Sequence, residues 1–266
     1  LLGALQNGEK IVVFGDYDAD GITGSTVLIT SLREIESRMR HNGAGNDERM
    51  VRSTSSVESR RTTDDGRRTS PSDISSYIPH RDKEGYGLQM ESVTKLADEG
   101  AQLIVTVDCG IACVNEIAEA RKRGVDVIVV DHHQFGDTLP DAVLIHPGIP
   151  GETYPFKSLA AVGVAWKLAS ALLVEARSRG LDIPETYEKW LLDLVSIATI
   201  TDIVPLVGEN RVLERYGLRV LNKSRRPGLL SLFERAGLTR GDIKERDVGF
   251  AIGPRLNAAG RMEHAS

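Results

Sequence analysis

The fold is decided by residues 11–25, IVVFGDYDADGITGS, where a short apolar run leads directly into closely spaced aspartates. The leading residues, IVVF, are typical of a strand that is buried on both faces. Asp16, Asp18 and Asp20 follow at alternate positions, and a helical pattern then begins. Carboxylates crowded at the end of a buried strand repel one another, and desolvation makes each charge more costly. Because a bound divalent cation would offset that cost, the stretch predicts a metal site.

The composition is that of a soluble globular protein without an overall basic signature. The chain has 266 residues, of which 41% are hydrophobic and 27% charged, and a formal net charge of −5. Any surface for nucleic acid must therefore be local. No apolar run approaches the ~18 residues of a membrane span, so we expect no membrane partner and a cytoplasmic location. Cys109 and Cys113 are interpreted as reduced thiols, because a structural zinc site would need further ligands.

Beyond the opening stretch, short apolar strands alternate with helical patterns. We expect strands at residues 77–79, 103–107, 125–130 and 142–145, with helices at 89–99 and 114–123. Strands that are apolar throughout are typical of a parallel sheet with both faces covered. From residue 159 the pattern is mostly helical. We therefore predict an α/β fold, a parallel sheet flanked by helices and followed by a mostly helical part, with residues 1–150 as the metal-binding core and 151–266 as its helical continuation.

Residues 37–76 differ in composition from the rest of the chain. They are rich in Arg, Ser, Thr, Asp and Gly, with almost no large apolar residue. Such a segment cannot bury a core, so we expect a disordered or mobile surface insertion. Its eight arginines would suit a flap that binds nucleic acid. Interleaved acids and the absence of stacking aromatics favour a solvated insertion instead.

Acids and imidazoles follow three of the predicted strands. Asp18 and Asp20 follow the first, Asp108 follows the strand at 103–107, and the run DHH at 131–133 follows the next. In parallel sheets, ligands bind outside the carboxyl ends of the strands. Asp202 is a lone acid in a later apolar stretch, so it should be paired, hydrogen-bonded or bound to metal.

These residues divide into metal ligands and catalytic groups. Carboxylate oxygens with one imidazole suit Mn²⁺ or Mg²⁺ better than structural zinc. The candidate ligands are Asp18, Asp20, Asp108, His132 and Asp202. With Asp108 bridging, two ions about 3.5–4 Å apart would activate a water and stabilise the leaving oxygen in a phosphoryl transfer. His133 could contact the scissile phosphate, Asp131 could orient an imidazole, and Asp16 fits either a ligand or a supporting acid.

Each feature taken alone has a simpler interpretation. Asp108 followed by Cys-Gly is typical of a turn, and Asp202 could be a helix cap. A lone His-His is more often a surface pair or a packed pair than a pair of ligands. Residues 16–21, DYDADG, are called the aspartate loop. This loop lacks the bidentate Glu that a calcium loop of the EF-hand type needs at its twelfth position. Together the simpler interpretations fail, because chance rarely places acids at three consecutive strand ends.

Six motifs carry a resemblance to a known family. They are GDYDADG (15–21), YIPHRDKEGYGL (77–88), VTVDCG (105–110), VVDHH (129–133), ATITDIVPL (198–206) and GPRLNAAGR (253–261). Four of them resemble the successive motifs of the DHH phosphoesterases. The motifs at 77–88 and 253–261 resemble those of the RecJ branch, which are bacterial single-strand-specific 5′→3′ DNA exonucleases of DNA repair and recombination.

The resemblance implies manganese-dependent hydrolysis of phosphodiesters, with Mg²⁺ as a substitute and two ions per site. It implies the same five metal ligands that the spacing of acids and imidazoles indicates. It also implies that His133 contacts the scissile phosphate. Arg255, Asn257 and Arg261 would contact a phosphate of the bound strand, because a guanidinium fork and an amide suit that group; helix capping is the alternative for Asn257. His80 and Arg81, with Tyr86 and Gly87 nearby, would line the substrate path or serve the structure.

Single-stranded DNA is the implied substrate, and a single-strand-binding protein and a helicase are the implied protein partners. The chain departs from the pattern at the insertion and at its end, where relatives continue into a second domain, so we expect a catalytic-core fragment. A phosphodiesterase for short oligonucleotides or cyclic dinucleotides, or a pyrophosphatase, typically has His where this chain has Phe14. A non-catalytic replication scaffold is disfavoured by the intact ligand set.

Overall fold

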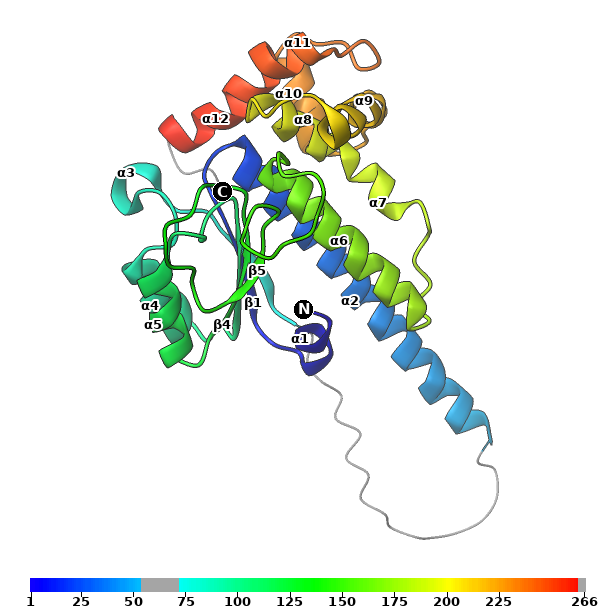
Figure 1. Cartoon of the computed structure of the whole chain (residues 1–266). Helices are drawn as coiled ribbons and strands as arrows, with labels where there is room; N and C mark the ends of the chain where they lie inside the picture. Colours follow the sequence, from blue (N-terminus) through cyan, green and yellow to red (C-terminus); the bar gives the residue numbers. More distant parts are fainter. Residues whose placement is uncertain (54–71, 263–266) are drawn as a thin grey trace.

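The central element is a five-stranded parallel sheet. The structure is a computed structural model that describes residues 1–53 and 72–262, without the side chains of 43–53 and 261–262. Within that part the strand order is β2-β1-β3-β4-β5 (Figure 1). The strands are β1 (Ile11–Gly15), β2 (Ile74–Tyr77), β3 (Leu103–Val107), β4 (Asp126–Val130) and β5 (Val143–Ile145). Gly15 pairs with Val107, and Val107 with Val130, so β1, β3 and β4 end level with one another.

Helices cover both faces of the sheet, as the apolar strands predict. Ile11 and Val13 pack into one core cluster, whereas Val12 and Phe14 pack into another, because side chains alternate along a strand. Helices α2 (Ala19–Ser53) and α6 (Ala161–Ser178) lie on the first face, and α4 (Met90–Asp98) and α5 (Val114–Lys122) on the second (Figure 1). The predicted α/β fold with a covered parallel sheet is confirmed.

The second half of the chain is mostly helical, as predicted, and shares its core with the first face of the sheet. Its elements are α7 (Tyr187–Trp190), α8 (Leu192–Thr201), α9 (Gly208–Leu221), α10 (Pro227–Arg235), α11 (Glu245–Asp247), the π-helix η1 (Val248–Ile252) and α12 (Gly253–Met262). Eight of the ten residues of α8 are buried, because it packs against α9, α2 and α6. Two short helices, α1 (Leu2–Asn7) and α3 (Arg81–Glu84), complete the fold.

The expectation for residues 37–76 is partly wrong. Helix α2 continues to Ser53, and residues 74–76 belong to the edge strand β2. Pairs of Glu34 with Arg38 and of Glu36 with Arg40, each at 2.8 Å and four residues apart, extend the helix past residue 37. An edge strand needs few apolar side chains because the backbone of β1 supplies its hydrogen bonds. Residues 54–71 lie outside the described part, and the division of the chain at residue 150 stays a prediction.

None of the helices in residues 1–53 and 72–262 combines the length and apolar character needed to span a membrane.

Candidate metal centre

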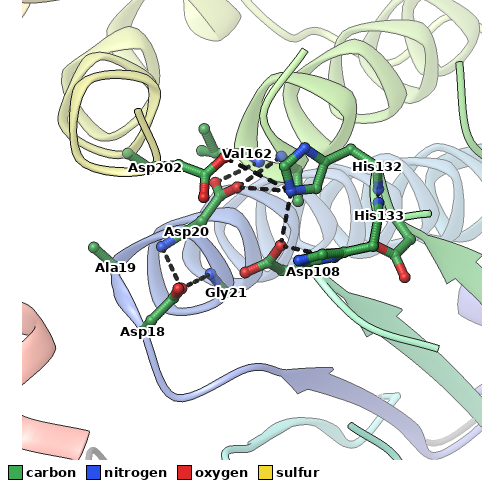
Figure 2. Close-up of polar contacts among 12 residues, drawn as sticks. Asp18, Ala19, Asp20, Gly21, Asp108, His132, His133, Val162 and Asp202 are labelled. Carbon is green, nitrogen blue, oxygen red and sulfur yellow. Dashed lines mark hydrogen bonds and ion pairs between the residues drawn. The ribbon is translucent and has the colours of Figure 1, made fainter. Parts of the chain in front are cut away.

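The predicted ligands converge at the carboxyl edge of the sheet. Asp16, Asp18 and Asp20 follow β1, Asp108 follows β3, His132 and His133 follow β4, and Asp202 caps the carboxyl end of α8. Figure 2 labels all of these residues except Asp16. Their ligand atoms form three overlapping groups, each within 4.8 Å: Asp16 with Asp18 and Asp108, Asp20 with His132 and Asp202, and Asp108 with His132 and His133. Residues nearly two hundred positions apart therefore meet in one place.

Backbone amides orient the carboxylates of the aspartate loop. Asp18 Oδ1 accepts hydrogen bonds from the amides of Asp20 at 2.8 Å and Gly21 at 3.1 Å, which caps the start of α2. Asp20 accepts from the amides of Ala161 at 2.7 Å and Val162 at 2.8 Å, at the start of α6 (Figure 2). The amino-terminal ends of two helices thus hold two acids in place, where the helix dipole favours negative charge.

The ring of His132 lies at the middle of the acids. Its Nε2 is 3.3 Å from Asp108 Oδ1, 3.7 Å from Asp202 Oδ2 and 3.9 Å from Asp20 Oδ2. Burial, with a contribution from His133, lowers the pKa of His132 to about 4. His132 Nε2 has no hydrogen-bond partner among the described residues. A neutral imidazole can bind a metal ion through such a nitrogen.

Several buried polar atoms at this point lack hydrogen-bond partners within the described residues. They include Asp16 Oδ1, Asp108 Oδ1 and His132 Nε2. Burial, followed by repulsion from Asp18, raises the pKa of Asp16 to about 7. Burial and then Asp20 raise the pKa of Asp108 well above its usual value. Unpaired buried acceptors are costly, so carboxylates and one imidazole that share this space fit a divalent cation.

The backbone is strained at two points of the centre. Among the described non-glycine residues, only Asp108 and Ile203 have a positive φ, of 64° and 60°. Asp tolerates this left-handed conformation, whereas a β-branched residue rarely adopts it. Asp108 is a predicted ligand, and Ile203 directly follows the predicted ligand Asp202. Such strain is typical of functional sites whose surroundings hold the backbone in place.

Asp131 organises the DHH turn and belongs to none of the three groups of ligand atoms. Its Oδ1 accepts from the amides of His132 and His133 and from His133 Nδ1, at 2.7, 3.1 and 2.8 Å, and its Oδ2 accepts from Ile111. Burial opposes ionisation of Asp131, but these donors outweigh burial and lower its pKa. The hydrogen bond between His133 Nδ1 and Asp131 Oδ1 raises the pKa of His133, whose side chain is 43% exposed. This arrangement fits the predicted role of Asp131 in orienting an imidazole.

The residues predicted to bind substrate are only partly brought together. The Arg81 guanidinium lies 5.1 Å from the centroid of the Tyr17 ring, beside the aspartate loop. His80 caps α3 by accepting from the amide of Asp82. Arg255, in α12, donates to the carbonyl of Ala251 in the preceding π-helix η1.

Asn257 and Tyr86 contact the centre directly. Asn257 Oδ1 accepts from the amide of Ala19 at 2.8 Å. The Tyr86 hydroxyl donates to the backbone carbonyl of Asp108 at 3.0 Å. Arg261 lies in α12, but its side chain is outside the described part. The roles of all these residues toward a substrate stay predictions.

Sequence reasoning missed His146, which supports the DHH turn from behind. This buried ring follows β5 and contacts the His133 carbonyl through Nε2 at 2.8 Å. The signal that could have found it is its position, because it follows a strand end as Asp108 and Asp131 do. The hydrogen bonds from the amides of Ala161 and Val162 to Asp20 were also not predicted, because nothing in the sequence around Asp20 indicates them.

Fold and site together define a class: a parallel α/β domain with a centre of carboxylates and one imidazole at the carboxyl edge of its sheet. Residues 10–199 match the DHH family, N-terminal domain, and the chain belongs to this family.

The chain is also similar to individual proteins. It is 40% identical over 263 residues to the single-stranded-DNA-specific exonuclease RecJ of Bacillus subtilis (strain 168), covering 98% of this chain and 28% of that protein. It is 38% identical over 274 residues to the RecJ of Escherichia coli (strain K12), covering 100% of this chain and 41% of that protein. A crystal structure of exonuclease RecJ bound to manganese matches with a TM-score of 0.75 and 35% identity, over 99% of this chain and 56% of that one. The resemblance found in the motifs is confirmed.

Proposed function

We propose that this chain is the metal-dependent catalytic part of a single-strand-specific DNA exonuclease that acts in DNA repair and recombination. The observation that carries the proposal is the meeting of Asp108 and His132 with other acids, where buried ligand atoms have no hydrogen-bond partner. Relatives named as single-stranded-DNA-specific exonucleases support the substrate class. The chain spans only 28% and 41% of these two relatives, so activity, substrate and direction of digestion are all proposals.

Mn²⁺ is the proposed cofactor, with Mg²⁺ as a substitute, because related RecJ structures are complexes with Mn²⁺ and Mg²⁺. The proposed ligands are Asp18, Asp20, Asp108, His132 and Asp202. When bound, a pair of ions would activate a water and stabilise the leaving oxygen. Asp108 could serve either ion, because it belongs both to the group with Asp16 and Asp18 and to the group with His132 and His133.

Three further residues of the centre, Asp131, His133 and Arg81, would orient the substrate phosphate. Asp131 accepts from His133 Nδ1, which fixes the ring and favours its protonated form. A protonated His133 can donate to a non-bridging phosphate oxygen and hold it against the centre. Arg81 lies beside the aspartate loop and can pair with a phosphate of the strand. A single-strand-binding protein and a helicase as partners, and a cytoplasmic location, remain predictions.

The test is hydrolysis of a 5′-phosphorylated, 3′-labelled single strand with Mn²⁺, beside the same sequence as a duplex and beside a dinucleotide. Digestion of the long single strand alone supports the proposal. Cleavage of the dinucleotide alone would make the chain a phosphodiesterase of short oligonucleotides. Failure to cleave any substrate despite tight Mn²⁺ binding, also with the relatives' additional length restored, would favour a non-catalytic scaffold.

A further inference from the structure

We propose that Asn257 is a positioning residue of the metal centre. It acts through the backbone of the aspartate loop, and α12 thereby sets the spacing between that loop and Asp202. This inference rests on the proposed metal-dependent function. It gives Asn257 a task that differs from contact with the substrate.

The first step is the start of α2, which carries two predicted ligands. A helix leaves its first amides without partners inside the helix. Asp18 accepts from the amides of Asp20 and Gly21, and Asn257 Oδ1 accepts from the amide of Ala19 at 2.8 Å. Ala19 lies between the two proposed ligands Asp18 and Asp20. Asn257 therefore accepts from the one of these three helix-starting amides that Asp18 does not reach. A shift of this amide would move both carboxylates.

The second step is the close approach of α12 to the same loop. A Cβ atom on Gly260 would lie 2.5 Å from the carbonyl oxygen of Tyr17, between Asp16 and Asp18. No side chain fits at that distance from backbone, so this contact requires glycine. Asn257 and Gly260 are three positions apart and therefore share one face of the helix. The face of α12 that carries both residues lies directly against the aspartate loop.

The third step is the opposite end of α12, which packs on α8. A Cβ atom on Gly253 would clash with Thr201 Cγ2, and Thr201 directly precedes Asp202. Helix α12 therefore touches two of the segments that supply proposed ligands: α8 near the start of α12, and the aspartate loop near its end.

The test measures Mn²⁺ affinity directly, from the electron paramagnetic resonance signal of free Mn²⁺ during titration, together with the melting temperature of the metal-free protein. Asn257→Ala should weaken Mn²⁺ binding by about tenfold, as loss of a group supporting a ligand does, with a small change in melting temperature. Asn257→Asp keeps the acceptor oxygen and should restore most of the affinity.

The matched control is Asn222→Ala. The Asn222 side chain also bonds backbone groups, donating to Leu218 and Ile243 and accepting from Gly241, but it lies away from the centre. It should lower the melting temperature and leave Mn²⁺ affinity unchanged. Unchanged affinity of Asn257→Ala, or parallel losses of affinity and melting temperature as in a merely structural role, would overturn the inference. Failure of the unchanged protein to bind Mn²⁺ would instead overturn the proposed function as well.

Discussion

The ring of His146 supports the backbone of His133. Its Nε2 lies 2.8 Å from the His133 carbonyl oxygen, and its Nδ1 lies 2.9 Å from the amide of Gly148. An amide can only donate, so Nδ1 accepts and Nε2 carries the proton that it donates to His133. A single neutral tautomer thus ties the DHH turn to the segment after β5.

His146→Ala should lower the free energy of unfolding by about 2 kcal/mol, because it leaves the His133 carbonyl and the Gly148 amide without their partner. His146→Asn offers a donor and an acceptor on a shorter side chain and should recover part of the loss. Urea denaturation of the metal-free protein measures both changes. Equal stability of His146→Ala and the unchanged protein would contradict the support assigned to this ring.

Asp108→Asn should stabilise the metal-free protein at pH 7.5 by about 1 kcal/mol, because it removes a buried charge from a cluster of acids. It should also abolish the gain in melting temperature on adding Mn²⁺. Asn tolerates the left-handed backbone at this position, so the change avoids the strain that Ala would add. The exposed Asp182→Asn is the control and should change neither quantity. A loss of metal-free stability would show that Asp108 is mainly structural.

The metal-free protein should become less stable as the pH rises from about 4 to about 7. Burial and neighbouring acids raise the pKa of Asp16 to about 7 and of Asp202 to about 6, and they also raise those of Asp20 and Asp108. In that window the native state holds protons that the unfolded state has released, so each rise in pH favours unfolding. His132, with its lowered pKa, contributes in the opposite sense, but the carboxyl groups outnumber it.

Saturating Mn²⁺ should reverse this pH dependence, because the cation binds the deprotonated ligands. Melting temperatures at pH 4.5 to 7.5, with chelator or with Mn²⁺, measure both trends. Stability that rises with pH in the presence of chelator would mean that the acids are compensated in some other way.

Ile203→Gly should raise the free energy of unfolding by about 0.5–1 kcal/mol, because it relieves a left-handed backbone at a β-branched residue. The side chain is 88% exposed, so little apolar burial is lost. Val207→Gly is the matched control: Val207 is also exposed, but its φ of −124° is ordinary. That variant should be destabilised, and a loss for both variants alike would argue against strain at Ile203.

The ligand-bearing edge could be predicted because its signals are local. The strand Leu103–Val107 is apolar throughout, and Asp108 follows it directly, so periodicity and chain order sufficed. Parallel strands then bring the residues after their ends to one edge without further information. Asp202 was found because a lone acid in an apolar stretch needs a partner.

The supports of the centre could not be predicted in the same way. His146 contacts the backbone of His133 across a loop and a strand, and Asn257 contacts Ala19 from the far end of the chain. Helix capping was one interpretation of Asn257, but the sequence does not reveal the partner of either side chain. The continuation of α2 past residue 37 depends on pairs such as Glu34 with Arg38, which a reading of overall composition overlooks. Contacts that depend on tertiary packing thus account for most of what was missed.

The position of β1 has a consequence for synthesis of the chain. Residues 11–15 emerge early, yet this strand pairs on both sides with strands made later, and its loop meets Asp202 and Asn257 only near the end. Contacts of such long sequence separation form slowly. The proposed ligands can all be present only after the chain has grown past residue 202. A cation that needs the full proposed set would therefore bind late in synthesis.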